Sequence, residues 1–296
     1  MPKVNDEYPG KKPVNAQISD AEMIAKAKEN YSKDGNTKKV EHKFPTEIVD
    51  LPSRGLLYPK DNPLSQGQIE MKYMTAKEED ILTSQSYIKQ GVVLDKLFKA
   101  LIIGNGKGEP IVYNDLIVGD KNAIMIAARI LGYGKDYEAE INTPSGGKQK
   151  EVVDLTQFMD KEFDSSVLTE PHVNEFEYKL PTSQRILKYK ILNNKDQAGI
   201  DAELKGLKKI HRGGLDRSMS IRLIHSIISV DGDDSRGAVR NFVNNEFLAI
   251  DSRAFREELK RIQPDIDLKV ECYDDQTHEP FEVDLPIGVN FFWPGV

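Results

Sequence analysis

The sequence is poor in cysteine and tryptophan, with one of each, and it lacks a long apolar run. The single cysteine, Cys272, excludes a disulfide within the chain and agrees with a reducing compartment. No run approaches the roughly 18–20 apolar residues that a membrane span requires. The opening residues MPKVNDEYPG contain no apolar signal-peptide core. We therefore predict no membrane association and expect the chain to fold in the cytosol.

The sequence also has no excess of positively charged residues. The chain has 41 lysine and arginine residues against 48 aspartate and glutamate residues, which gives a formal net charge of −7. Proteins that bind nucleic acid through many phosphates usually have a basic balance or a basic stripe, so we predict no nucleic-acid partner. Hydrophobic residues make up 39% of the sequence, which is enough to build a core.

Residues 1–43 are expected to be a flexible N-terminal arm that carries one short helix. Residues 1–17 are polar and contain proline, which favours mobility. Ser19 and Glu22 then form a capping-box pattern, from which an amphipathic helix should run to about Asn30. Two interpretations stay open, namely a disordered tail and an arm that becomes ordered on a partner.

The rest of the sequence predicts an α+β fold built from two similar modules, residues 44–165 and 166–296. Each module is expected to pack helices on a small antiparallel sheet and to carry a long β-hairpin. Duplication accounts for the length of 296 residues better than one large irregular domain does. The alternative is a chance match between short amphipathic elements.

Several matching positions support this internal repeat. A strand with alternating apolar residues precedes a helix that Thr75 caps and Gly91 ends, and another precedes a helix that Thr182 or Ser183 should cap.

The last helix and the hairpin of each half also match. Asp120 and Asp251 each start the last predicted helix of their half. The hairpins then follow at 137–155 and 268–285.

Two segments look like ligand-binding loops but lack residues that such loops require. Residues 104–108 read G-N-G-K-G, but a phosphate loop needs a Lys-Ser or Lys-Thr pair that leads into a helix. In the acidic segment that begins at Asp231, Arg236 and Phe242 stand where a calcium loop needs glycine and a bidentate glutamate. A flexible turn and an acidic turn between helices are the better interpretations.

The reactive side chains do not form a catalytic or metal-binding pattern either. Cys272 is expected at an inward-facing strand position, as a buried structural residue. His278 follows across a hairpin tip, but zinc would need two more ligands, and only Asp274 and Asp275 are near. The basic run at 205–212 is interpreted as a solvated face. We therefore predict a protein with no enzyme activity, no cofactor and no metal.

The stretch L-P-S-R-G-L-L-Y-P, residues 51–59, is too apolar for a solvated loop and too rich in proline and glycine for a helix or central strand. One interpretation is an intramolecular clasp, in which Arg54 pairs with a carboxylate or caps a helix C-terminus while Leu56, Leu57 and Tyr58 pack under the first module. The other is an interface anchor, because arginine and tyrosine are favoured at binding hot spots. The candidate residues for either role are Leu51, Pro52, Arg54, Gly55, Leu57 and Tyr58.

The sequence G-V-N-F-F-W-P-G-V ends the chain and contains three large aromatic residues, Phe291, Phe292 and Trp293. Such side chains either fold back into the core or serve as interface anchors, and both alternatives stay open.

Four of these segments together resemble the T4-type bacteriophage baseplate hub protein family. They are L-P-S-R-G-L-L-Y-P, the M-T-A-K-E-E-D-I-L that starts at Met74, the G-Y-G-K-D-Y at the first hairpin, and the terminal F-F-W-P. The resemblance covers roughly residues 45–296. It implies a structural or assembly protein that binds other phage tail proteins in an oligomeric ring or a hetero-assembly. It also implies a location in the virion tail baseplate, and in the host cytoplasm during assembly. The alternative is a soluble assembly chaperone that is absent from the mature virion.

The resemblance also bears on the hairpin tips. In related proteins these tips can carry paired cysteines that would suit zinc. The first tip of this chain, residues 142–145, has no cysteine, and the second keeps only Cys272. If the relatives bind metal there, the resemblance implies that turn hydrogen bonds hold the first tip of this chain instead.

Overall fold

The computed structural model describes residues 45–161, 163–168, 170–210, 216–287 and 291–292. The chain divides into two units, residues 1–43 and 44–296, and every described residue belongs to the second. The predicted arm, with its capping box at Ser19, lies outside the described residues.

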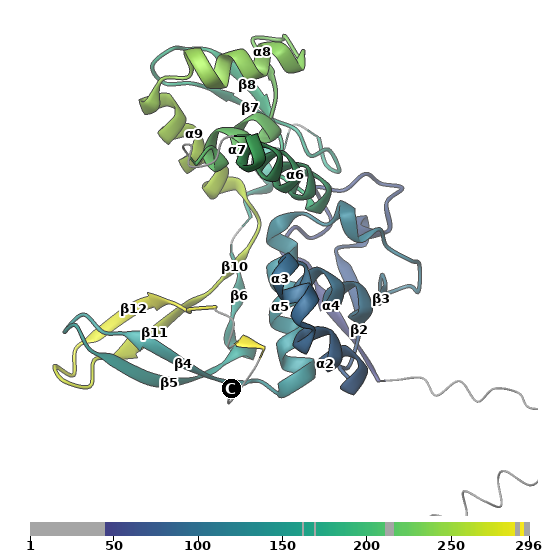
Figure 1. The fold of residues 1–296 in the computed structure, drawn as a ribbon, viewed down its shortest axis with the longest axis vertical. Coiled ribbons are helices and arrows are strands. Elements are labelled where there is room, and N and C mark those ends of the chain that lie inside the picture. The colour runs from purple at the N-terminus through teal and green to yellow at the C-terminus, as the bar shows by residue number, and fades with distance from the viewer. Residues whose placement is uncertain (1–44, 162, 169, 211–215, 288–290, 293–296) are drawn as a thin grey trace, which may run out of the picture. The chain divides into compact units, whose positions relative to one another are not determined.

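The fold of the described residues is α+β, as predicted, with eight α-helices and several small antiparallel sheets (Figure 1). None of the described helices is long and apolar enough to cross a membrane. The helices are α2 (Ala76–Thr83), α3 (Gln85–Gln90), α4 (Val93–Leu101), α5 (Val118–Tyr133), α6 (Asn194–Ile210), α7 (Ser218–Ser226), α8 (Arg236–Asn241) and α9 (Ala249–Ile262). The strands are β1 (Thr46–Asp50), β2 (Gln68–Lys72), β3 (Ile102–Gly104), β4 (Asp136–Asn142), β5 (Lys148–Asp154), β6 (Met159–Asp160), β7 (Phe176–Lys179), β8 (Ile186–Tyr189), β9 (Ile227–Val230), β10 (Ile266–Asp267), β11 (Lys269–Tyr273) and β12 (Pro280–Asp284).

The first sheet has the strand order β1–β2–β3 and is antiparallel. Alternation along β2 turns Ile69 and Met71 into the core. Helix α2 begins after Thr75, at the predicted capping box. The predicted continuous helix from Thr75 to Gly91 is wrong, because Ser84 has an extended backbone and separates α2 from α3. Gly91 does end α3, in the left-handed conformation that favours glycine.

The second sheet has the order β7–β8–β9 and is also antiparallel. The helix predicted after Thr182 or Ser183 is wrong, because this segment is a tight turn between β7 and β8. The backbone N–H groups of Thr182 and Ser183 donate to the Asp251 carboxylate at 2.8 and 2.9 Å. A carboxylate from the first turn of α9 therefore accepts from both backbone donors of this turn.

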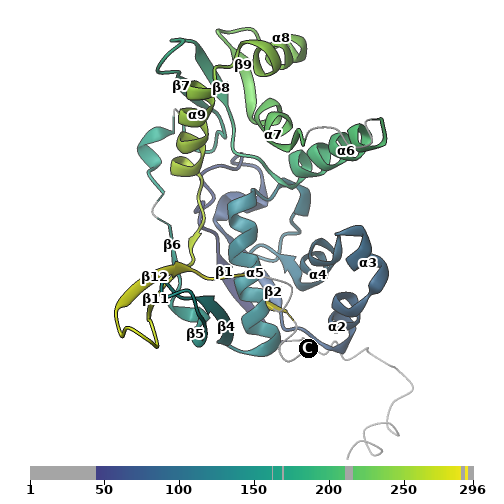
Figure 2. The same cartoon turned by 60° about the vertical axis from the view of Figure 1, so that its left-hand side comes forward.

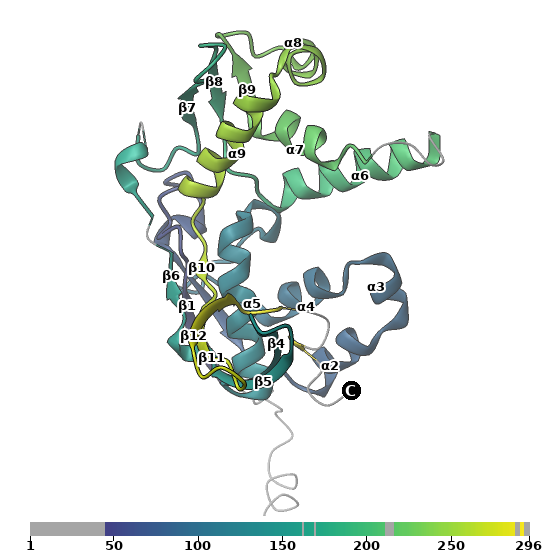
Figure 3. The same cartoon turned by 90° about the vertical axis from the view of Figure 1, so that its left-hand side faces the viewer.

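The two predicted hairpins are confirmed as β4–β5 and β11–β12 (Figure 3). They are joined side by side through Gln149, whose amide nitrogen donates to the Tyr273 carbonyl at 2.8 Å. The Gln149 amide oxygen in turn accepts from the Asp275 backbone N–H at 3.2 Å. One buried glutamine side chain thus connects segments that are more than a hundred residues apart in sequence.

Contacts between early and late segments also cross the predicted boundary at residue 165. Strand β6 lies beside the segment that follows α9 (Figure 2) and pairs there with β10. The Asn122 amide donates to the Asp265 carboxylate at 2.7 Å. Gly119, in the first turn of α5, packs so closely that an added Cβ would lie 1.6 Å from the Pro264 carbonyl oxygen. Only glycine permits this approach between α5 and the segment before β10.

The two halves share an order of elements. In each, two antiparallel strands are followed by helices, a third strand beside the second, one further α-helix in the first half and two in the second, and a long hairpin. The third strand follows its helix without a gap in both cases, as α4 leads into β3 and α7 into β9. This order is consistent with duplication, but residues 44–296 form one compact unit. The two modules and their boundary stay a prediction.

Candidate functional site

The connection between β1 and β2 contains the L-P-S-R-G-L-L-Y-P stretch and folds into a compact loop. Leu51, Leu57 and Tyr58 are buried, at 1%, 2% and 2% exposed. Gly55 adopts a left-handed φ of 76°, and an added Cβ there would lie 2.3 Å from the Ser65 carbonyl oxygen. The loop therefore packs both on the core and on its own later turn, at a position that only glycine can occupy without strain.

The loop is tied to α5 by hydrogen bonds to Asp120. Ser53 donates to this carboxylate twice, from its backbone N–H at 2.9 Å and from its hydroxyl at 2.7 Å. The Tyr58 hydroxyl donates to it at 2.6 Å and accepts from the Ile117 backbone N–H at 3.1 Å. We call Ser53, Tyr58 and Asp120 the loop clasp. Asp120 was expected to start its helix, but α5 begins two residues earlier and the carboxylate points to the loop instead.

Burial changes the acidity of the loop clasp. Asp120 is 0% exposed, and its desolvation raises the pKa of the carboxyl from 3.8 to about 6, against the lowering effect of the Tyr58 and Ser53 hydrogen bonds. Desolvation, reinforced by the charge of Asp120, also raises the pKa of Tyr58 well above its ordinary value. The tyrosine hydroxyl therefore stays a donor at all physiological pH values.

This pKa shift predicts a pH-dependent stability. Since the folded chain holds the Asp120 proton more tightly than the unfolded chain, the Asp120 contribution to the free energy of unfolding is greatest below pH 4 and falls as the pH rises through 6. The expected change is about 3 kcal/mol. Urea denaturation between pH 4.5 and 7.5 should show about 2 kcal/mol of this change in the difference between wild type and Asp120→Asn. Parallel pH curves for the two proteins would contradict it.

Arg54 does not take the role expected of it in a clasp. Its side chain is exposed, and no hydrogen bond or ion pair of its guanidinium occurs among the described residues. The nearest effect is electrostatic, since the Arg54 charge opposes the rise in the pKa of Asp160 that burial produces. Arg54 has a left-handed φ of 51°, so the backbone turns its side chain outward while its neighbours face the core.

A second buried aspartate holds the matching turn of the other half. Asp251 lies in the first turn of α9, as Asp120 does in α5, and is 0% exposed. Its two oxygens accept from the β7–β8 turn, just as those of Asp120 accept from the β1–β2 connection. In both halves, a helix start therefore fixes the connection between the first two strands of a sheet.

Hydrogen bonds to Asp274 hold the tips of the two hairpins together. Asp274, which is 1% exposed, accepts from the backbone N–H groups of Ser145 at 3.1 Å, Gln276 at 2.8 Å and Thr277 at 3.2 Å. The hydrogen bond from Ser145 has the largest lowering effect on the pKa of Asp274. Together with the backbone hydrogen bonds of the tip, it lowers this pKa to about 2. The Thr143 hydroxyl accepts from the Gly147 N–H at 3.0 Å. Turn hydrogen bonds thus hold the first tip.

The side chains discussed as metal ligands do not converge. Among the described residues, no group of three or more histidine, cysteine, aspartate or glutamate side chains could hold a metal ion. Cys272 is buried, and desolvation raises the pKa of its thiol.

Removing the Asp274 carboxylate should loosen both tips. In Asp274→Ala, the backbone N–H groups of Ser145, Gln276 and Thr277 lose their acceptor, so their amide hydrogen exchange should accelerate at least several-fold. Asp275→Ala is the matched control, because that neighbouring side chain is exposed and accepts no hydrogen bond in this cluster. Unchanged exchange at all three amides in Asp274→Ala would contradict the assigned role.

Two of the three aromatic residues at the end of the sequence lie in the core. Phe291 is 0% exposed and Phe292 is 2% exposed. Phe291 meets the Tyr137 ring edge-to-face at a centroid distance of 5.0 Å, and Phe292 lies 6.3 Å from the Phe98 ring. These two residues therefore follow the first of the two interpretations, in which the aromatic side chains fold back into the core. Trp293 lies outside the described residues.

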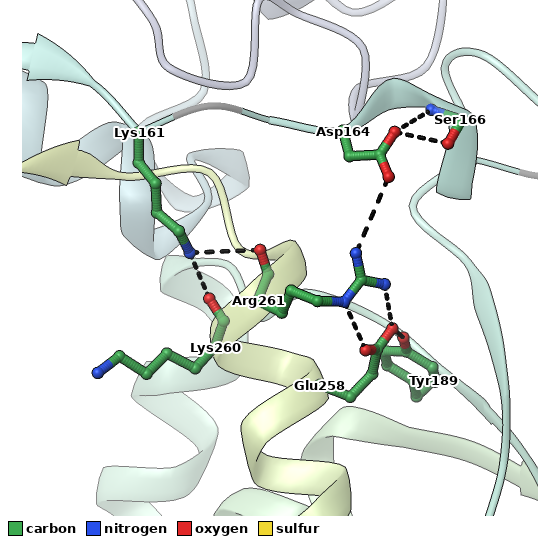
Figure 4. A network of polar contacts seen from close by, with 7 residues as sticks. All are labelled: Lys161, Asp164, Ser166, Tyr189, Glu258, Lys260 and Arg261. Carbon is green, nitrogen blue, oxygen red and sulfur yellow. Dashed lines mark hydrogen bonds and ion pairs between the residues drawn. The ribbon is translucent and has the colours of Figure 1, made fainter.

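A further polar network ties the segment after β6 to the end of α9 (Figure 4). Lys161 donates to the backbone carbonyls of Lys260 and Arg261 at the C-terminal end of the helix, where a cation is favourable. Arg261 donates to both oxygens of Glu258 at 2.8 Å, and its guanidinium lies 3.9 Å from the Asp164 carboxylate. This network fixes the connection between the two halves.

Comparisons with protein-family models, with curated proteins and with solved structures found no match for this chain.

Proposed function

We propose that this chain is a non-enzymatic structural or assembly protein of a contractile phage tail, which binds other tail proteins in the baseplate hub. The motif resemblance provides the biological setting. The support from the structure is one observation, the exposure of Arg54 between two buried residues, Ser53 and Gly55.

The residues of the motif differ in their roles in the fold. Ser53 and Tyr58 donate to Asp120, and Gly55 allows the loop to pack on itself. These residue types are therefore accounted for by the fold. The Arg54 side chain has no such role, although arginine is one of the residue types that contribute most at interfaces. A guanidinium on a loop fixed from beneath loses little conformational entropy when it binds a partner.

Substitution of Arg54 separates an interface role from a structural one. In Arg54→Ala, we expect an unchanged thermal unfolding midpoint but a loss of infectious particles when the variant replaces wild type in the phage. Lys60→Ala is the matched control, because it removes an exposed cation from the same connection. A lower unfolding midpoint in Arg54→Ala would favour the clasp role instead. Normal assembly with Arg54→Ala would overturn the proposed role of this residue.

Retention in the particle distinguishes the structural role from the chaperone role. Mass spectrometry of purified virions should detect the chain if it is a structural subunit. Its absence from virions, together with a requirement for it during assembly, would identify a soluble assembly chaperone.

A further inference from the structure

A groove with an apolar floor runs along one face of α9. Arg256, Leu259 and Gln263 follow one another at helical spacing and line both of its adjoining cavities. The smaller cavity, of about 180 Å³, lies between α7, α9 and the residues that follow β8. The larger one, of about 690 Å³, continues past the end of α9 along β10 to the start of β11. The groove is therefore extended along the helix.

The floor of the smaller cavity is built by apolar side chains from several parts of the chain. Met219 is 50% exposed above this floor, and methionine adapts its shape readily to a bound apolar group. The apolar lining residues are Val118, Ile191, Leu192, Met219, Leu223 and Leu259.

The rim of this smaller cavity is positively charged. Its described lining includes Lys190, Arg222 and Arg256 and contains no carboxylate. Lys190 already has an ion-pair partner. Among the described residues, the acceptors of the two guanidinium groups are neutral: Arg222 donates to the Gln197 amide oxygen at 2.8 Å, and Arg256 donates to the Ser252 carbonyl at 3.3 Å.

Other arginines of α9 are paired with carboxylates. Arg253 donates to Glu257 at 3.0 Å, and Arg261 donates to Glu258 at 2.8 Å (Figure 4). In a chain with a net charge of −7, acidic side chains are plentiful. Arg256 lies between these two paired arginines and pairs with no carboxylate of the described residues, although Asp265, Asp267 and Asp284 line the larger cavity.

We propose that this groove binds an acidic, apolar polypeptide segment of a partner protein. An apolar side chain of that segment would fill the smaller cavity, and its carboxylates would pair with Arg222 and Arg256. The guanidinium fork matches a carboxylate in a bidentate geometry, and the apolar floor lowers the screening of such a pair by water. The extended groove suits a length of polypeptide better than it suits one small anion. This inference is independent of the phage setting.

The test uses the full chain and fluorescein-labelled dodecapeptides measured by fluorescence anisotropy. One peptide pool has glutamate at every fourth position with leucine, isoleucine or phenylalanine randomised between. The matched pool has glutamine in place of each glutamate. We expect the glutamate pool to bind, and the double variant Arg222→Gln with Arg256→Gln to weaken that binding about tenfold or more. Arg253→Gln is the control, because it removes an arginine from the same helix outside the cavity.

Several results would overturn the proposal. They are equal binding of the glutamate and glutamine pools, unchanged binding by the double variant, and no binding of either pool. Binding of sodium dodecanoate with no binding of the peptides would also overturn it, in favour of a small amphiphilic carboxylate. Because Arg222 and Arg256 are exposed, the double variant should keep the wild-type circular dichroism spectrum, so a loss of binding can be separated from a loss of fold.

Discussion

Replacing Asp120 by alanine is expected to lower the free energy of unfolding by roughly 3–5 kcal/mol. The substitution removes the acceptor of the Ser53 backbone N–H, the Ser53 hydroxyl and the Tyr58 hydroxyl, all of which are buried. A buried donor left without an acceptor costs about 1–3 kcal/mol, and entry of water into the gap would recover part of this cost. Urea denaturation of the full chain at pH 6 measures the difference.

Two further variants make this prediction specific. Asp61→Ala removes an exposed carboxylate from the same connection and should change the free energy of unfolding by less than about 0.5 kcal/mol. Tyr58→Phe removes one donor to Asp120 and the acceptor of the Ile117 N–H, so its effect should lie between those of the two aspartate variants. If Asp120→Ala unfolded like Asp61→Ala, the loop clasp would not stabilise the fold.

The residues of the L-P-S-R-G-L-L-Y-P stretch have different roles in and around the loop clasp. The side chains of Ser53 and Tyr58 point to one buried carboxylate, and Gly55 permits a tight turn between them. The left-handed backbone at Arg54 places the arginine side chain outside. One short segment can therefore stabilise the fold and offer a rigid contact to another protein.

Local signals in the sequence predicted those elements whose causes are local. The capping box at Thr75 marks the start of α2, and the alternation of apolar residues marks both hairpins. These patterns act within a few residues, so one sequence is enough to recognise them.

Other elements depend on partners that are distant in the sequence. Thr182 and Ser183 have the residue types of a helix cap, but their N–H groups bind Asp251, almost seventy residues away. The sequence also contains no sign that Ser53 is the partner of Asp120 or that Ser145 is the partner of Asp274. The two aspartates at the helix starts were recognised as a repeated feature, whereas their role in holding strand connections needed the tertiary contacts.

The groove on α9 was missed for a related reason. Arg222 and Arg256 belong to different helices, and each looks like an ordinary surface cation in the sequence. Their distinction is the absence of a carboxylate in the described lining of the cavity that they share. Spacing along one helix cannot reveal this, because the potential partners come from several elements.

Truncation of Phe291 or Phe292 to alanine is expected to lower the free energy of unfolding by about 3–5 kcal/mol in each case, the usual cost of removing a buried phenylalanine ring. The two rings meet edge-to-face at 5.2 Å. Phe291 also packs on Tyr137 of β4, and Phe292 on Phe98 of α4. The pair therefore joins the first hairpin to a helix of the first half, so its loss should destabilise segments far from it in the sequence. Chemical denaturation of each single variant measures the effect.

The double variant and a matched control decide between a core role and an interface role for these aromatic residues. Because the rings touch, the double variant Phe291→Ala with Phe292→Ala should lose a different amount of free energy than the two single variants added together. Tyr273→Ala removes an aromatic side chain that is 67% exposed, so its stability should stay close to that of wild type. A stable Phe291→Ala or Phe292→Ala protein that fails only in binding a partner protein would contradict the core role. It would mean that the aromatic pair leaves the core when a partner is present, since a ring that supports the fold cannot be removed without a measurable cost.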